Sequence, residues 1–135
     1  MAKTNSKGMT ANGRSARTTS FAGIPRAVME TDDYKRLPAS AKSLLLEFAY
    51  QYRGRNNGDL SAAWSVMRKR GWKSQTTLCK ALQQLLEANL ILCTRQGRFL
   101  NPGGMCALYA VTWNPIDECK GKHDVDPTTT APRKF

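Results

Sequence analysis

The fold is decided by residues 71–84, which read Gly-Trp-Lys-Ser-Gln-Thr-Thr-Leu-Cys-Lys-Ala-Leu-Gln-Gln. Gly71 is predicted to end one helix, because glycine readily adopts the left-handed conformation that follows a helix. Ser74 is predicted to cap the next one, since its side-chain oxygen can accept an unpaired backbone N–H of the first turn. The pattern predicts a helix over about 74–88 with one apolar face, formed by Leu78, Ala81, Leu82 and Leu85.

Helical patterns also precede this stretch. Thr31 or Asp32 is predicted to cap a short helix that ends near Leu37. Pro38 can begin the next helix, because the N–H that proline lacks is not needed in a first turn. The apolar face of that helix is predicted from Ala41, Leu44, Leu45, Phe48 and Tyr52. A strand fragment at 59–61 and a helix over 62–70 are expected next, the latter with Ala63, Val66 and Met67 facing inward.

After residue 89 the pattern changes from helical to alternating. Residues 90–95 and 106–113 are predicted to be strands, and the glycine-containing stretch 97–104 is predicted to join them as a long hairpin loop. The expected order is therefore helix, strand fragment, helix, turn, helix, strand, loop, strand. This predicts a mainly α fold with a small β-hairpin.

The chain of 135 residues fits one domain flanked by two irregular segments. Residues 1–20 contain four cations and no acid, with few apolar groups to offset the entropy of ordering, so a disordered basic arm is expected. Residues 21–116 are predicted to form the folded domain. Residues 117–135 contain Asp126-Pro127 and Pro132, and they are predicted to form a flexible tail.

The net charge of +11 predicts attraction to polyanions such as nucleic acid or an acidic protein. No stretch approaches the roughly 20 apolar residues that span a bilayer, so no membrane partner is expected. The early lysines are not followed by an apolar segment, which argues against a secretory signal. A bacterial cytoplasmic or nucleoid location is therefore expected.

Metal and catalytic chemistry find little support in the sequence. The four cysteines lie 13 or 14 residues apart, which is not the spacing of a zinc site, and they are expected to be free thiols that behave as small apolar residues. His123 is the only histidine and falls in the predicted tail, away from any nucleophile. No glycine-rich phosphate loop is present. We therefore expect no metal, no cofactor and no enzymatic activity.

Two segments resemble a known family. Thr77-Leu78-Cys79-Lys80-Ala81-Leu82 through Leu85, followed by Ala88-Asn89-Leu90-Ile91, is similar to the recognition-helix region of winged-helix regulators. Asn89 replaces the glycine of that family, and asparagine also tolerates a left-handed conformation. The stretch 109–113 resembles the last strand of a wing, and Ile24-Pro25-Arg26 with residues 54–60 resembles small helix-turn-helix proteins of phages and mobile elements. Covering about residues 21–116, this resemblance implies a winged helix-turn-helix domain.

The helix over 74–88 also has the chemistry expected of a DNA-reading helix. Opposite Leu78, the helical period places Thr76, Lys80 and Gln83, whose side chains can contact base edges in the major groove. Cations concentrate nearby, because residues 53–98 contain nine bases and two acids, whereas residues 30–47 contain three bases and four acids. The predicted DNA-binding residues are Arg68, Lys69, Arg70, Lys73, Ser74, Gln75, Thr76, Thr77, Lys80, Gln83, Gln84, Arg95 and Arg98.

These features lead to a hypothesis with two alternatives. The main hypothesis is sequence-specific binding of double-stranded DNA by the helix at about 74–88 and the wing at about 95–105, in a transcriptional regulator of a bacterium, phage or plasmid. The first alternative is a protein-interaction module whose basic surface docks on an acidic partner protein, for example to inhibit a host nucleoprotein. The second is a replication-initiator module. A homodimer through the 24–37 segment or the first long helix is left open.

Overall fold

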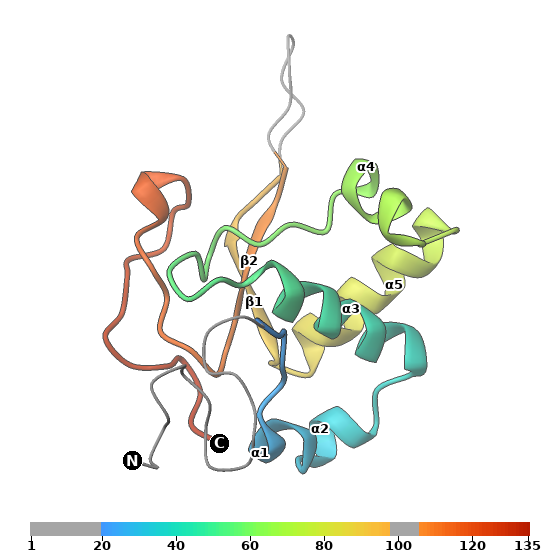
Figure 1. Ribbon diagram of the computed structural model, residues 1–135, viewed down its shortest axis with the longest axis horizontal. Coiled ribbons are helices and arrows are strands. Elements are labelled where there is room, and N and C mark those ends of the chain that lie inside the picture. The colour runs from blue at the N-terminus through green and yellow to red at the C-terminus, as the bar shows by residue number, and fades with distance from the viewer. Residues whose placement is uncertain (1–19, 98–105) are drawn as a thin grey trace, which may run out of the picture.

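The computed structural model describes residues 20–97 and 106–135. Residues 1–19 of the predicted basic arm (1–20) and residues 98–105 of the predicted wing (95–105), including Arg98, lie outside the described residues. The chain forms a mainly helical small domain with a two-stranded antiparallel hairpin (Figure 1). In chain order its elements are α1 (Arg26–Met29), α2 (Asp32–Lys35), α3 (Ala39–Gln51), α4 (Trp64–Met67), the 3₁₀ helix η1 (Arg68–Arg70), α5 (Gln75–Glu87), β1 (Ile91–Arg95), β2 (Leu108–Val111) and the 3₁₀ turn η2 (Cys119–Gly121).

The predicted helix signals of the N-terminal half are confirmed. The Thr31 side chain caps α2 by accepting the backbone N–H of Tyr34 at 3.2 Å. Pro38 stands immediately before α3, and the inward face of α3 is fully buried at Leu44, Leu45 and Phe48. This face packs against α5, so α3 and α5 together form the centre of the apolar core.

The segment between α3 and α5 differs in part from the predicted helix over 62–70. The α-helix begins only at Trp64, because Ala63 is extended, and it tightens to a 3₁₀ helix at Arg68. Only Met67 is buried, while Val66 is 42% exposed, so the prediction that Val66 faces inward is wrong. In so short a helix a single residue per turn reaches the core. Gly71 ends η1 in the left-handed conformation, with a φ of 101°, which confirms the helix end predicted at this glycine.

The hairpin pairs β1 with β2 in an antiparallel register that places Ile91 opposite Val111. The ladder is irregular between Cys93 and Arg95. The predicted strand fragment at 59–61 is reduced to Leu60, which exchanges two backbone hydrogen bonds with Tyr109 at 2.8 and 3.1 Å on the other edge of β2. The Tyr109 ring packs on Phe48 of α3, and burial raises the pKa of its hydroxyl to about 12.

The prediction of a flexible tail at 117–135 is wrong, because this segment packs along the side of the sheet opposite α3 and α5 (Figure 1). Backbone hydrogen bonds join Asp124 to Thr94 at 2.8 Å and Arg133 to Thr112 at 3.0 Å. His123, expected to be exposed, is buried, and its Nε2 lies 2.7 Å from the carbonyl oxygen of Asp117. Proline and aspartate prevent regular structure here, but they do not prevent packing through long-range hydrogen bonds.

Candidate nucleic-acid interface

One face of α5 is buried and the opposite face is exposed and polar. Leu78, Ala81 and Leu85 point into the core, as their spacing predicted. Thr76 and Lys80 are exposed on the other side. Gln83 is exposed as well, and its amide donates a 3.2 Å hydrogen bond to Glu87 one turn further along. This face therefore presents hydroxyl, ammonium and amide groups on a rigid helix.

The beginning of α5 is held by its cap and by Trp72. The Ser74 hydroxyl oxygen accepts the backbone N–H of Thr77 at 3.2 Å, which confirms the predicted cap. Trp72, half-buried, packs against the core and anchors the turn. Lys73, Ser74 and the next three residues of the predicted set, Gln75, Thr76 and Thr77, are exposed. The turn and the first helical turn thus form one polar, solvent-facing surface.

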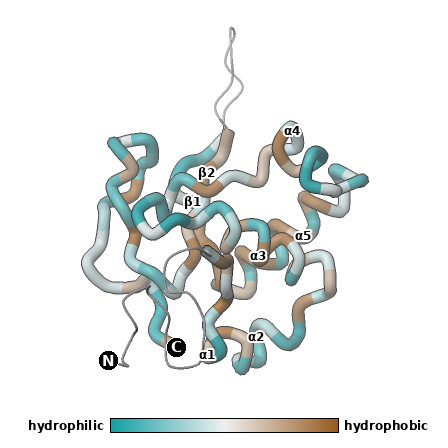
Figure 2. The backbone as a smooth tube through the Cα atoms, viewed as in Figure 1, coloured by the Kyte–Doolittle hydropathy of each residue, from teal (hydrophilic) through white to brown (hydrophobic). Residues whose placement is uncertain are grey.

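The 3₁₀ helix η1, which contains Arg68, Lys69 and Arg70, follows α4 directly and lies beside the N-terminal end of α5 (Figure 1). Figure 2 shows that the chain is strongly hydrophilic in this segment. Arg68 and Lys69 are exposed. Within residues 20–97 and 106–135, no acidic side chain forms an ion pair with Arg68, Lys69, Lys73 or Lys80. Four positive charges therefore remain uncompensated next to the polar face of α5.

Arg70 differs from its two neighbours because its side chain turns back onto α3. Its Nε donates a 2.9 Å hydrogen bond to the Glu47 carboxylate, and its guanidinium carbon lies 3.9 Å from the centre of the Tyr50 ring. The hydrogen bond with Glu47 raises the pKa of the Arg70 guanidinium. Arg70 therefore links η1 to α3, and its predicted contact with DNA would require breaking the bond with Glu47.

Gln84 also departs from the predicted set. It follows the buried Ala81 by three residues, so its side chain points between α5 and the α2–α3 linker, where it lines a hollow with Leu37 and Pro38. Its Oε1 is buried without a hydrogen-bond partner among the described residues. Gln84 is thus half-buried, with its Oε1 turned inward, and its predicted contact with DNA stays a prediction.

Arg95 at the base of the wing is engaged within the fold. Its guanidinium donates to the Cys106 carbonyl at 2.7 and 3.1 Å and to the Lys122 carbonyl at 3.2 Å. These bonds join the end of β1 to Cys106, just before β2, and to the C-terminal segment. The predicted reach of Arg95 into a DNA groove would require breaking these bonds.

Cys79 was not among the residues predicted for this surface, but it is exposed on α5 one turn after Gln75 and one turn before Gln83. Its position on the helical wheel was a sufficient signal, but the residue was classed as a small apolar group. All four cysteines are free thiols; Cys79 and Cys106 are exposed, whereas burial raises the pKa of Cys93 and of Cys119. In the described part of the chain, no three His, Cys, Asp or Glu side chains come together as a metal site.

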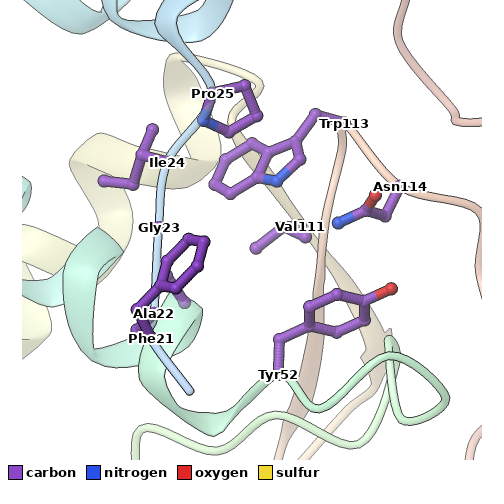
Figure 3. A pocket seen from close by; sticks show the side chains of 10 residues that line it. Phe21, Ala22, Gly23, Ile24, Pro25, Tyr52, Val111, Trp113 and Asn114 are labelled. Carbon is purple, nitrogen blue, oxygen red and sulfur yellow. The ribbon is translucent and has the colours of Figure 1, made fainter. Parts of the chain in front are cut away.

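A separate hollow of 380 Å³ lies between residues 21–25 and the end of β2 (Figure 3). The rings of Phe21, Tyr52 and Trp113 line it, and Asn114 contributes an amide at one edge. Its ten described lining residues include no carboxylate, histidine or cysteine, so the hollow lacks the acid, base and nucleophile of a hydrolytic site.

Comparison of the chain with protein-family models, with curated proteins and with solved structures found no match in any of the three. Among the described residues, no helix combines the length and the apolar character that a membrane crossing requires.

Proposed function

We propose that the chain is a winged helix-turn-helix protein that binds double-stranded DNA sequence-specifically, as a regulator of transcription in a bacterium, phage or plasmid. The observation that supports this best is the surface formed by the exposed face of α5 and four cations without an ionic partner in the described chain, Arg68, Lys69, Lys73 and Lys80. Phosphate-neutralising cations beside a rigid polar helix are what binding in the major groove requires.

In this proposal the residues have different tasks. Lys80 and Gln83 face the bases, because lysine can donate to guanine and glutamine can form a bidentate pair with adenine. Arg68, Lys69 and Lys73 contact phosphates, which positions α5 without reading sequence. The exposed hydroxyl groups of Thr76 and Thr77 and the amide of Gln75 extend the contact surface toward the start of the helix. The wing provides a second contact beyond the groove that α5 occupies.

The test is selection of duplexes from a random pool, followed by fluorescence anisotropy on the enriched duplex and on a scrambled one. Gln83→Ala is expected to weaken binding to the enriched duplex by about 5- to 150-fold, the equivalent of 1–3 kcal/mol, with a smaller loss on the scrambled duplex. Lys80→Ala is likewise expected to weaken binding to the enriched duplex more than to the scrambled one. Lys35→Ala is its matched control, since Lys35 is an exposed lysine on α2 outside the proposed surface. Equal losses on both duplexes would contradict base reading by α5.

The salt dependence provides a second measurement of the same surface. If Arg68, Lys69 and Lys73 neutralise three phosphates, log Kd should rise with log[salt] with a slope of about 2.7, and Lys73→Ala should lower that slope by about 0.9. A flat salt profile would contradict the electrostatic contact with DNA. Absence of any enriched duplex, together with stoichiometric binding of an acidic protein, would instead favour the protein-interaction alternative.

A further inference from the structure

Helix α3 has a second apolar face, opposite the one that packs on α5. Ala39, Ser43, Leu46 and Tyr50 follow at steps of four, three and four residues, and all four are exposed. This spacing places them in one stripe along the helix, and the stripe contains no charged residue. A helix that is apolar on two opposite sides is normally covered on both. The Arg70 guanidinium stacks on the Tyr50 ring at 3.9 Å, yet all four side chains of the stripe remain exposed.

Other exposed apolar side chains lie at the same surface. Leu46 is 52% exposed and lines a hollow with Met29 of α1, which is 42% exposed. Tyr50 is 46% exposed and lines a neighbouring hollow with Phe21, which is 91% exposed. Contiguous exposed apolar surface of this kind marks a site of protein association.

The stripe itself contains no charged side chain, but charged side chains flank it. Residues 30–52 contain three bases and four acids in a chain of net charge +11. Glu47 is neutralised by Arg70, and the Lys42 ammonium lies 5.1 Å from the centre of the Tyr34 ring. The hollows beside the stripe are also lined by Arg53 and Lys73. Two copies that meet at this surface therefore bring a few cations close together, a repulsion that salt screens.

The stripe is also complementary to itself in size. Its first half is small, at Ala39 and Ser43, and its second half is large, at Leu46 and Tyr50. In two antiparallel α3 helices related by a two-fold axis, one register places Ala39 opposite the partner's Tyr50 and, at the same time, Ser43 opposite the partner's Leu46. Hollows of 340 and 350 Å³ lie on either side of Ser43 and can receive these larger side chains. A two-fold interface requires this kind of self-complementarity.

We propose that the outer face of α3, with Met29, is the interface of a homodimer whose α3 helices cross antiparallel at Ser43 and Leu46. The inference does not depend on DNA binding, because the stripe lies on the side of α3 opposite the buried face that packs on α5. Lys73, which lines the 350 Å³ hollow beside Ser43, is shared with the proposed DNA surface.

The test is sedimentation velocity over a concentration series from about 1 to 200 μM, a range that brackets the micromolar affinities of modest interfaces. The wild-type chain should shift from monomer to dimer, and Leu46→Glu should raise the dimer Kd at least about tenfold, because it places an unpaired charge in the interface. Val66→Glu is the matched control, since Val66 is an equally apolar residue, 42% exposed, on α4 outside the stripe. The circular dichroism of each variant checks that the fold is retained.

Two further measurements keep the inference falsifiable. Raising the salt concentration should strengthen dimerisation, because it screens the repulsion between two basic chains, whereas it weakens DNA binding. The double variant S43C/L46C should form a disulfide-linked dimer under mild copper-phenanthroline oxidation, beyond the background of the wild-type thiols. A wild-type chain that stays monomeric throughout the series, or equal losses for Leu46→Glu and Val66→Glu, would overturn the proposal.

Discussion

Asn57→Ala is the sharpest test of how the edge of the sheet is stabilised. The buried Asn57 side chain makes hydrogen bonds to β2 that the backbone of a neighbouring strand would otherwise make. Leu60 pairs with the outer edge of β2 only at Tyr109. Two residues further along that edge, the Asn57 carboxamide bonds both backbone groups of Val111, accepting from its N–H at 2.8 Å and donating to its carbonyl at 3.0 Å. The same amide nitrogen lies 3.1 and 3.0 Å from the carbonyls of Asn114 and Pro115.

The magnitude for Asn57→Ala follows from these contacts. The amide has two N–H groups and one acceptor, so about three effective hydrogen bonds are lost at a site with no exposed surface. A lost bond costs about 1 kcal/mol, and a buried group left unpaired costs more. We expect a loss of about 3–4 kcal/mol in the free energy of unfolding, a large part of the 5–15 kcal/mol typical of a domain. At a urea m-value of about 2 kcal/mol/M, the midpoint should fall by about 2 M.

The assay is urea unfolding followed by tryptophan fluorescence and by circular dichroism. Asn56→Ala is the control, because the neighbouring Asn56 makes two hydrogen bonds, to Arg53 and Gln51, in a partly exposed turn where water can replace them. It should cost about 1 kcal/mol. Asn57→Asp keeps the shape but faces three carbonyls with an acceptor, so it should be at least as damaging at neutral pH as Asn57→Ala. A loss of 1 kcal/mol or less for Asn57→Ala would refute the reasoning.

Two further predictions concern the ends of α5. Ser74→Asp should leave the melting temperature unchanged, because aspartate caps a helix as well as serine does. It should nevertheless weaken DNA binding about 3- to 10-fold, because it places a negative charge near the phosphates. An unchanged DNA affinity would remove Ser74 from the interface. Arg133→Ala should cost about 1–2 kcal/mol in urea unfolding, because its guanidinium pairs with Asp33 at 2.6 Å and donates to the carbonyls of Ala88 and Asn89 at 3.0 and 3.2 Å, whereas Lys134→Ala should change stability by less than about 0.5 kcal/mol.

The parts of the fold that sequence could predict are those fixed by local chemistry. Thr31 and Ser74 cap helices, and Gly71 ends one, because each conformation depends on the residue itself and its near neighbours. Asn89 takes the left-handed conformation, φ 58°, that its place after α5 predicted. The C-terminal segment could not be predicted, since it is held by partners far along the chain. Arg133 and Asp33, for example, are 100 residues apart.

The same distinction applies to the candidate interface. Helical periodicity alone places Lys80 and Gln83 outward, and the structure agrees. Arg70 and Arg95 are exposed-looking cations in the sequence, but each has an internal partner whose position only the fold determines: Glu47 on α3 and the carbonyls of Cys106 and Lys122. Charge counts thus locate the basic surface, whereas tertiary contacts decide which cations remain available to a ligand.

The two proposals together constrain the DNA that a dimer could read. α3 lies between the proposed two-fold axis and α5, so three helix–helix contacts separate the two α5 helices of a dimer. At about 8–10 Å for each contact, their axes are at most about 24–30 Å apart. This falls slightly short of the ~34–36 Å between successive major grooves on one side of B-DNA. The polar face of α5 is also opposite the face that packs on α3, so the two polar faces of such a dimer point away from each other. This dimer would therefore present its two α5 helices to separate duplexes rather than to two half-sites of one duplex.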